Sequence, residues 1–153
     1  MRRMTENPRW KHRPPGSNWG DFGPDDQNGR LNLITPDKVR RAVAEVTEGL
    51  TFCLSLPLDL PGGNVLNPRR HPPLLRPTLR DGKPNLNYRL VTDNPRHSDV
   101  ICDDLVLMHL QYSTQWDSLA HVGQLFDADG DGVPEPRYYN GFRPQVDIFG
   151  PLD

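Results

Sequence analysis

The residue types most suited to chemistry lie within one short stretch of the chain and are Gln111, Gln115, Asp117 and His121. An aspartate carboxylate and a histidine imidazole can both bind a divalent metal ion, and a glutamine can add a carbonyl oxygen. The stretch follows an apolar run that ends at a flexible loop, which is a common place for a functional site. The residues alone leave two interpretations open: a metal site, or a polar strand end in which Asp117 caps a helix.

The same stretch resembles the His-x-Gly-Thr-His-x-Asp-x-Pro-x-His signature of the cyclase family, which contains kynurenine-formamidase-like metal-dependent hydrolases. The residues that fall on the defined positions of the signature are Gln111, Ser113, Thr114, Gln115, Asp117, Leu119 and His121. Three of them, Thr114, Asp117 and His121, match it outright. Two further blocks resemble one branch of that family, over 17–36 and, with the sequence YYNGF, over 138–142. Several separated blocks are more specific than one short motif.

The resemblance implies that Gln111, Gln115 and Asp117 occupy metal-ligand positions and that His121 is the general acid/base residue. The implied reaction is activation of water by Zn²⁺ or Mn²⁺, followed by attack on an amide, formamide or lactone carbonyl. Both histidine ligand positions of the family hold glutamine here. Because an amide oxygen is a harder and weaker ligand than imidazole, the affinity for zinc should fall and a hard cation such as Mn²⁺ or Mg²⁺ is favoured instead. We interpret the glutamines as a variant of one branch.

The fold that the resemblance implies is mixed α/β, with the swivelling β/β/α architecture of the cyclase family. Family members continue well beyond the position of Asp153, and later histidine and glutamate positions contribute to their site. We expect a disordered tail over 1–16. Residues 17–153 are expected to form the N-terminal part of a cyclase-family domain, which would therefore be incomplete. A non-catalytic fragment or an assembly subunit is the alternative that an incomplete site leaves open.

A helix over 36–48 is the clearest local prediction. Thr35 is a suitable N-cap residue, Pro36 suits the first helical position, and Gly49 favours termination. Apolar residues recur between them at helical spacing, at Val39, Ala42, Val43, Val46 and Leu50. The glycine-rich and asparagine-rich segment 17–34 before this helix is expected to be an ordered loop held by its aromatic side chains.

Two strands are predicted from alternating β-forming residues, over 51–58 and over 100–112. The proline-rich segment 59–98 between them is expected to be a long excursion, which is more often functional or disordered than a plain connector. A turn into a short helix is expected over 113–125, and loops are expected over 126–153.

Composition limits both the core and the partners. Only 35% of the residues are hydrophobic and 17 are proline, so we expect a modest core. A net charge of -2 argues against nucleic acid as a partner, and no apolar run is long enough for a membrane helix. We expect a cytoplasmic, homo-oligomeric enzyme with a small-molecule substrate. Cys53 and Cys102 lie in apolar surroundings and are expected to be buried, reduced thiols.

A second candidate metal site spans 127–135. Its Asp127, Asp129 and Asp131 have the spacing of a calcium loop, followed by a glycine at the sixth position. Tyr138 replaces the bidentate glutamate of an EF-hand, so an EF-hand is not expected. The alternatives are a thrombospondin-like Ca²⁺ loop, which Glu135 could complete, or an acidic turn without a cation.

Other polar and aromatic residues each have two interpretations. His109 shares a predicted strand face with Gln111 and either joins the site or is a hydrogen-bonded sheet histidine. Ser113 lacks the G-x-S-x-G elbow, which excludes a serine hydrolase of that class. The aromatic residues that either line a substrate pocket or pack in the core are Trp19, Tyr112 and Trp116.

Overall fold

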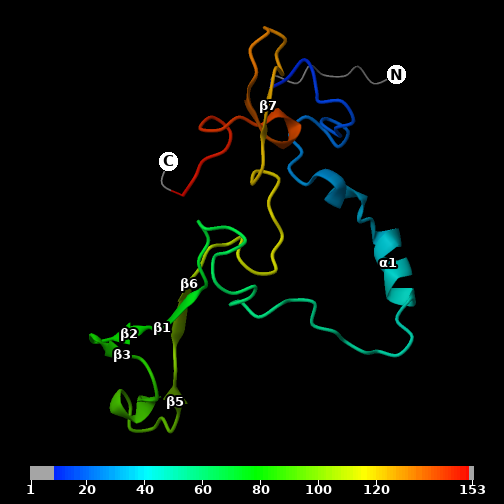
Figure 1. Ribbon diagram of the computed structural model, residues 1–153. Helices are drawn as coiled ribbons and strands as arrows, with labels where there is room; N and C mark the ends of the chain where they lie inside the picture. The colour runs from blue at the N-terminus through cyan, green and yellow to red at the C-terminus, as the bar shows by residue number, and fades with distance from the viewer. Residues whose placement is uncertain (1–8, 152–153) are drawn as a thin grey trace. The chain divides into compact units, whose positions relative to one another are not determined.

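The computed structural model describes residues 9–151, and the chain divides into two compact units (Figure 1). Unit 1 contains residues 1–51 and 117–153, and unit 2 contains residues 52–116. The two units are described separately below. Few helices and short antiparallel strands make up the described chain, which is consistent with the mixed α/β class.

Unit 1 contains short helices and one hairpin. Its elements are the 3₁₀ helix η1 (Gly29–Leu33), α1 (Pro36–Ala44), β7 (Gln124–Phe126), β8 (Glu135–Arg137) and the 3₁₀ helix η3 (Tyr139–Gly141). Strands β7 and β8 pair in antiparallel register, with Gln124 opposite Arg137 and Phe126 opposite Glu135. The hairpin thus carries the chain from the end of the 111–121 stretch into the Asp127–Asp131 loop and back.

Helix α1 confirms the helix prediction at its start and shortens it at its end. The Thr35 hydroxyl accepts a hydrogen bond from the Lys38 amide at 3.3 Å, as an N-cap residue should. The helix ends at Ala44, four residues before the predicted position 48. It buries none of its side chains, so no packing stabilises a further turn of a helix this short.

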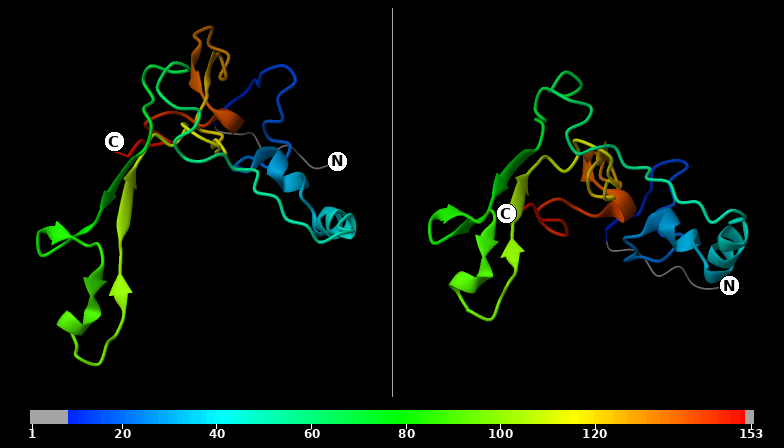
Figure 2. Two further views of the ribbon diagram at one scale, coloured as in Figure 1. Left: turned by 60° about the horizontal axis from the view of Figure 1, so that its bottom comes forward. Right: turned by 90° about the horizontal axis from the view of Figure 1, so that it is seen from below.

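Unit 2 consists of short antiparallel pairs. Its elements are β1 (Leu74–Pro77), β2 (Leu79–Arg80), β3 (Lys83–Pro84), β4 (Tyr88–Arg89), the 3₁₀ helix η2 (Leu90–Thr92), β5 (Val100–Ile101) and β6 (Asp104–Leu107). Strand β1 pairs with β6, β2 with β3, and β4 with β5. Figure 2 shows β1 and β6 side by side in both views.

Three of the strand and loop predictions are wrong in extent. Residues 51–58 form no strand, because their backbone groups bond to side chains rather than to a neighbouring strand. The Leu56 amide, for example, donates to the Thr114 hydroxyl at 3.0 Å. The segment 59–98 contains four short strands: a turn at Asp81 and Gly82 joins β2 to β3, whereas β1 and β4 pair with strands beyond the segment. The predicted strand over 100–112 is divided into β5 and β6 and ends at Leu107.

The segment 113–125 forms no helix and leads directly into β7, and the predicted loop region 126–153 contains β8 and η3. Both strands were missed because they are only three residues long and owe their hydrogen bonds to each other.

Few side chains are buried, as the composition predicts. Among residues 9–151, the buried apolar residues are Trp19, Tyr112 and Ala128. The Trp19 ring lies 6.2 Å from the Trp10 ring and 6.0 Å from the Phe126 ring, centroid to centroid, so aromatic packing holds the 17–34 segment as expected. The prediction of buried thiols is wrong: Cys53 and Cys102 are both exposed, because their segments have no second layer packed on them.

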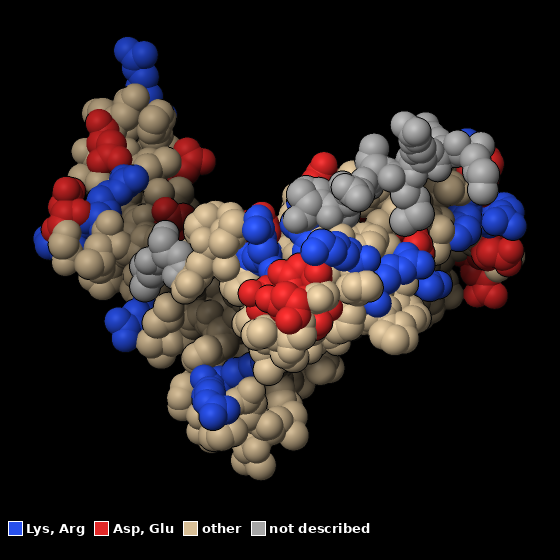
Figure 3. Space-filling model, turned by 90° about the horizontal axis from the view of Figure 1, so that it is seen from above, with Lys and Arg blue, Asp and Glu red and all other residues tan. Residues whose placement is uncertain are grey.

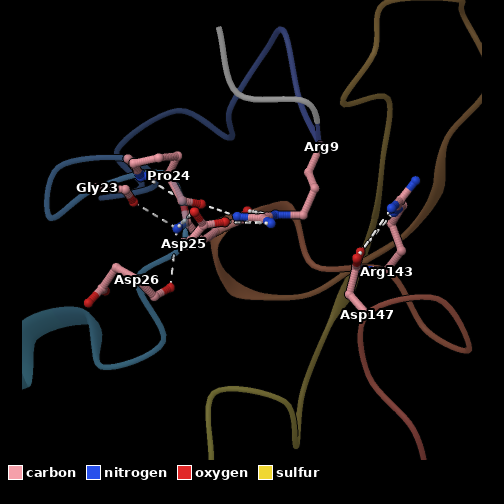
Figure 4. A network of polar contacts seen from close by, with 9 residues as sticks. Arg9, Gly23, Pro24, Asp25, Asp26, Arg143 and Asp147 are labelled. Carbon is pink, nitrogen blue, oxygen red and sulfur yellow. Dashed lines mark hydrogen bonds and ion pairs between the residues drawn. The ribbon is translucent and has the colours of Figure 1, made fainter. Parts of the chain in front are cut away.

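The described part of the predicted tail, residues 9–16, contacts the rest of unit 1, whereas residues 1–8 lie outside the described residues. The amides of Lys11 and His12 both donate to the Ala128 carbonyl, at 2.7 and 2.9 Å. Arg9 pairs with Asp25 at 3.0 Å and also donates to the Pro24 carbonyl (Figure 4).

Asn140 joins the 20–26 segment to η3. It is fully buried, and its Nδ2 donates to the carbonyls of Gly23 and Pro24 at 3.0 Å and of Asp26 at 3.2 Å. Its Oδ1 accepts from the Gly20 amide at 2.8 Å. One side chain thereby satisfies four backbone groups of a segment that has no sheet partner.

Acidic and basic side chains are interspersed on the face of the molecule that Figure 3 shows. Among the helices of residues 9–151, none is both long and apolar enough to cross a membrane.

Candidate functional site

Asp117 and His121 are placed by a tight turn. The His121 amide donates to the Ser118 carbonyl at 3.0 Å, and the Ala120 amide donates to the Ser118 hydroxyl at 3.3 Å. Both functional side chains are exposed. Within residues 9–151, no hydrogen bond or ion pair engages the Asp117 carboxylate or the His121 ring. These two groups are therefore available to a ligand.

Asp117 and His121 line one pocket of about 480 Å³, which is built entirely from unit 1. Its other walls include Ser17, Trp19 and Arg137. A pocket of this volume, with aromatic walls and a few polar groups, suits a small organic molecule. The structure thus brings two of the four predicted residues to one cavity.

The β7–β8 hairpin forms one wall of this pocket, and Gly123 allows its close approach. A Cβ atom at Gly123 would lie 2.8 Å from the Arg137 carbonyl oxygen and 3.1 Å from the Tyr138 ring. Only glycine fits there without a shift of the backbone. Gly123 therefore allows the chain after the 117–121 turn to lie close to Arg137 and Tyr138.

Tyr139 forms another part of the wall and is held by Asp26. The Tyr139 hydroxyl donates to the Asp26 carboxylate at 2.8 Å. Burial and this hydrogen bond raise the pKa of Tyr139, so the phenol stays protonated. Burial acts to raise the pKa of Asp26, but hydrogen bonds from Asn32, Tyr139 and Gly29 outweigh it and leave that pKa lowered. The hydrogen bond between Tyr139 and Asp26 holds this part of the wall in place.

Arg137 is the one cation among the described lining residues, and its side chain is only 6% exposed. Its Nη2 donates to the Glu135 carboxylate and lies 3.8 Å from the Asp129 carboxylate. Its Nε is buried without a hydrogen-bond partner, as is the Ser17 hydroxyl oxygen on another wall. No sequence signal singled out either residue.

The two glutamines of the predicted set belong to unit 2. Gln111 is half-buried, and its backbone carbonyl accepts a hydrogen bond from Arg70 at 2.8 Å. Gln115 is exposed. The four residues are therefore not assembled within either unit, and the complete ligand set stays a prediction.

The other residues of this region have structural roles. The Tyr112 hydroxyl donates to the Gly63 carbonyl at 2.8 Å, and Ser113 donates to the Pro57 carbonyl at 2.8 Å. His109 lies outside β6; its Nδ1 accepts from the His71 amide at 3.1 Å. Trp116 is 97% exposed and packs in no core.

The loop after β7 brings together three carboxylates. The ligand atoms of Asp127, Asp129 and Asp131 lie within 4.8 Å of one another. Burial acts to raise the pKa of Asp127, but the amides of Gly132, Gly130 and Asp131 outweigh it and lower that pKa. Backbone amides thus already hold this loop. Glu135, which could have completed a calcium site, pairs with Arg137 instead.

Comparison with known proteins gives a similarity to a solved structure. No family model and no curated protein matches the chain. The chain is similar to the crystal structure of a novel cyclase, with 31% sequence identity and a TM-score of 0.58. The alignment covers 83% of this chain and 37% of that chain, so this chain spans little more than a third of the cyclase.

Proposed function

We propose that the chain is the N-terminal part of a cyclase-family hydrolase of the arylformamidase type, from a branch with glutamine at two ligand positions. The reaction would be metal-dependent cleavage of an amide, formamide or lactone bond. The observation that carries this proposal is the 31% identity to a cyclase over 83% of the chain. The pocket that contains Asp117 and His121 supports it, because the family signature assigns chemistry to these two positions.

The residues present fit a divalent metal ion. Asp117 supplies a carboxylate that no described residue engages, and Gln111 and Gln115 would supply amide oxygens. Because this donor set consists of oxygen atoms, it favours Mn²⁺ over Zn²⁺, although both remain candidates. When bound, such a cation would lower the pKa of water and polarise a carbonyl group.

His121 would move the proton. Its ring lines the pocket, and its backbone closes the turn that also places Asp117. A histidine in this position can accept a proton from water and return it to a leaving group. Trp19, which also lines the pocket, would offer an apolar surface to the substrate.

Asp117→Ala is expected to abolish uptake of Mn²⁺ or Zn²⁺, because it removes the only charged ligand of the proposed set. Elemental analysis after equilibration with each metal and desalting measures this directly. Asp99→Ala, which removes an exposed carboxylate of the same kind outside the set, should retain the metal. Equal metal content in both variants would refute the assignment.

A Ca²⁺-binding function at 127–135 is a second candidate, favoured by the convergence of three carboxylates within 4.8 Å. If the loop binds Ca²⁺, titration of Ca²⁺ into the chain should give a saturable heat of binding. Asp131→Asn should weaken that binding, because it removes one charge while its side-chain oxygen can still accept from the Val133 amide. No heat down to millimolar affinity would leave the loop as an acidic turn held by backbone amides.

A further inference from the structure

Two histidine rings lie next to each other in unit 2. The centroids of the His71 and His109 rings are 5.7 Å apart, and the ring planes are tilted by 51°. An ion that is bound by two imidazole nitrogens at about 2.0–2.1 Å keeps the ring centroids roughly 4.5–6.5 Å apart. The observed separation is therefore that of two rings that can share one metal ion.

The β1–β6 ribbon positions both histidines. The start of β1 pairs with the end of β6, so the chain leaves both strands at the same end of the ribbon. His71 precedes β1 by three residues, and His109 follows β6 by two. Pro72 and Pro73 connect His71 to β1, and proline limits the backbone of its own residue and of the residue before it. The two rings are thus held near each other by the backbone and do not meet by chance rotation of a loop.

The His109 ring is supported in the way that a metal-bound histidine usually is. Its Nδ1 lies 3.1 Å from the His71 backbone nitrogen and 3.4 Å from the His71 carbonyl oxygen. Nδ1 can therefore accept from the amide or, in the other tautomer, donate to the carbonyl. In that second tautomer the Nε2 lone pair is available to a cation. Metal-bound histidines commonly donate their other ring N–H to a backbone carbonyl in this manner.

The His71 ring is available as the second ligand. No hydrogen bond or ion pair with a residue in 9–151 engages its ring nitrogens, and both histidines are exposed. Because an exposed ring can rotate, His71 can turn a nitrogen toward an ion on His109 Nε2. The guanidinium of the adjacent Arg70 donates to the Gln111 carbonyl at 2.8 Å, which gives this cation a partner of its own.

The donor atoms decide which cation suits the pair. In the described part of the chain, the Asp127, Asp129 and Asp131 loop is the only cluster of three His, Cys, Asp or Glu ligands, so no carboxylate or thiolate completes this pair. Imidazole suits copper, nickel and zinc, whereas magnesium, calcium and manganese prefer oxygen ligands. Among the late divalent ions, Cu²⁺ binds a given set of nitrogen ligands most tightly.

We propose that His71 and His109 form a binding site for Cu²⁺, with weaker binding of Ni²⁺ and Zn²⁺. One ring nitrogen of each residue binds the ion, the His71 carbonyl accepts the Nδ1 proton of His109, and water fills the other positions. The site shares no ligand with Gln111, Gln115 and Asp117, so it does not depend on the proposed hydrolase function. Two imidazoles hold Zn²⁺ too weakly to keep it through desalting, so the zinc content expected of Asp117→Ala is unaffected.

Titration of Cu²⁺ into the full chain, followed by electron paramagnetic resonance, tests this proposal. The first equivalent of Cu²⁺ should give a spectrum with hyperfine splitting from two imidazole nitrogens. His71→Ala and His109→Ala should each weaken Cu²⁺ binding by at least about tenfold, because loss of a direct ligand costs no less than loss of an outer-shell partner. Ni²⁺ should compete for the site, and Mn²⁺ should not.

His97→Ala is the matched control, because His97 is an exposed histidine of the same unit outside the pair. It should leave the Cu²⁺ affinity unchanged. Asp117→Ala should also keep the two-nitrogen spectrum, which separates this site from the proposed hydrolase site. Splitting from fewer than two nitrogens, unchanged affinity in His71→Ala or His109→Ala, or an equal loss in His97→Ala would each overturn the proposal.

Discussion

Replacing Asn140 with alanine is expected to lower the free energy of unfolding of unit 1 by about 4 kcal/mol. The substitution removes four hydrogen bonds between a fully buried side chain and the 20–26 segment, and it leaves the Gly20 amide and the Asp26 carbonyl without a partner among the described residues. Asn140 also has a φ of 56°, in the left-handed region that asparagine tolerates better than alanine. The midpoint of thermal unfolding of unit 1 should fall by roughly 16–32 °C.

Tryptophan fluorescence is a suitable measurement, because Trp10 and Trp19 pack on each other within unit 1. Gln145→Ala is the matched control. Gln145 has a φ of 60° in the same unit but is exposed, so its loss should change the free energy of unfolding by less than about 0.5 kcal/mol. Equal midpoints for the Asn140 and Gln145 variants would show that the network does not hold unit 1 together.

The same melting curves bear on the alternative of a non-catalytic fragment. A cooperative transition in the unmodified chain would weaken that alternative, since a fragment with few buried residues has little to unfold together. A gradual change without a midpoint would support it.

Local signals predicted the parts of the fold that depend on local interactions. The start of α1 was predictable because Thr35 and Pro36 act within one turn of the helix. The end was not, because it depends on packing that α1 lacks. Strands failed for a related reason: residues 51–58 have the composition of a strand, but a strand needs a neighbouring backbone, which no residue pattern supplies.

The candidate site shows the same division. The signature residues Asp117 and His121 were predictable because they are close in sequence and one turn carries both. Arg137 and Ser17 were not, since they reach the same pocket from opposite ends of unit 1. The N-G pair at Asn140 marks a turn in the sequence, but its contacts with 20–26 connect residues that are more than a hundred positions apart.

Replacing both Gln111 and Gln115 with histidine is expected to raise zinc affinity by at least about 100-fold, provided that the two residues are metal ligands. Zinc prefers imidazole nitrogen to an amide oxygen, and even an outer-shell partner alters metal affinity by about 10–100-fold. Together with His121, the double variant would therefore have all three histidines of the family signature. Competition with a chromophoric zinc chelator measures the gain, and Mn²⁺ affinity should rise much less.

Three further variants separate a restored site from histidines that bind zinc by themselves. Gln145→His adds one exposed imidazole elsewhere in the chain and should gain little. His109→Ala in the double variant removes the existing His71–His109 pair, whose rings lie 5.7 Å apart in unit 2. The gain in zinc affinity should remain, because this pair is not part of the proposed ligand set. Adding Asp117→Ala to the double variant should abolish the gain, since Asp117 is the charged ligand of the proposed set. A gain that survives the loss of Asp117 would assign zinc to the histidines of unit 2 alone, and the cyclase-type site would then be absent from this chain.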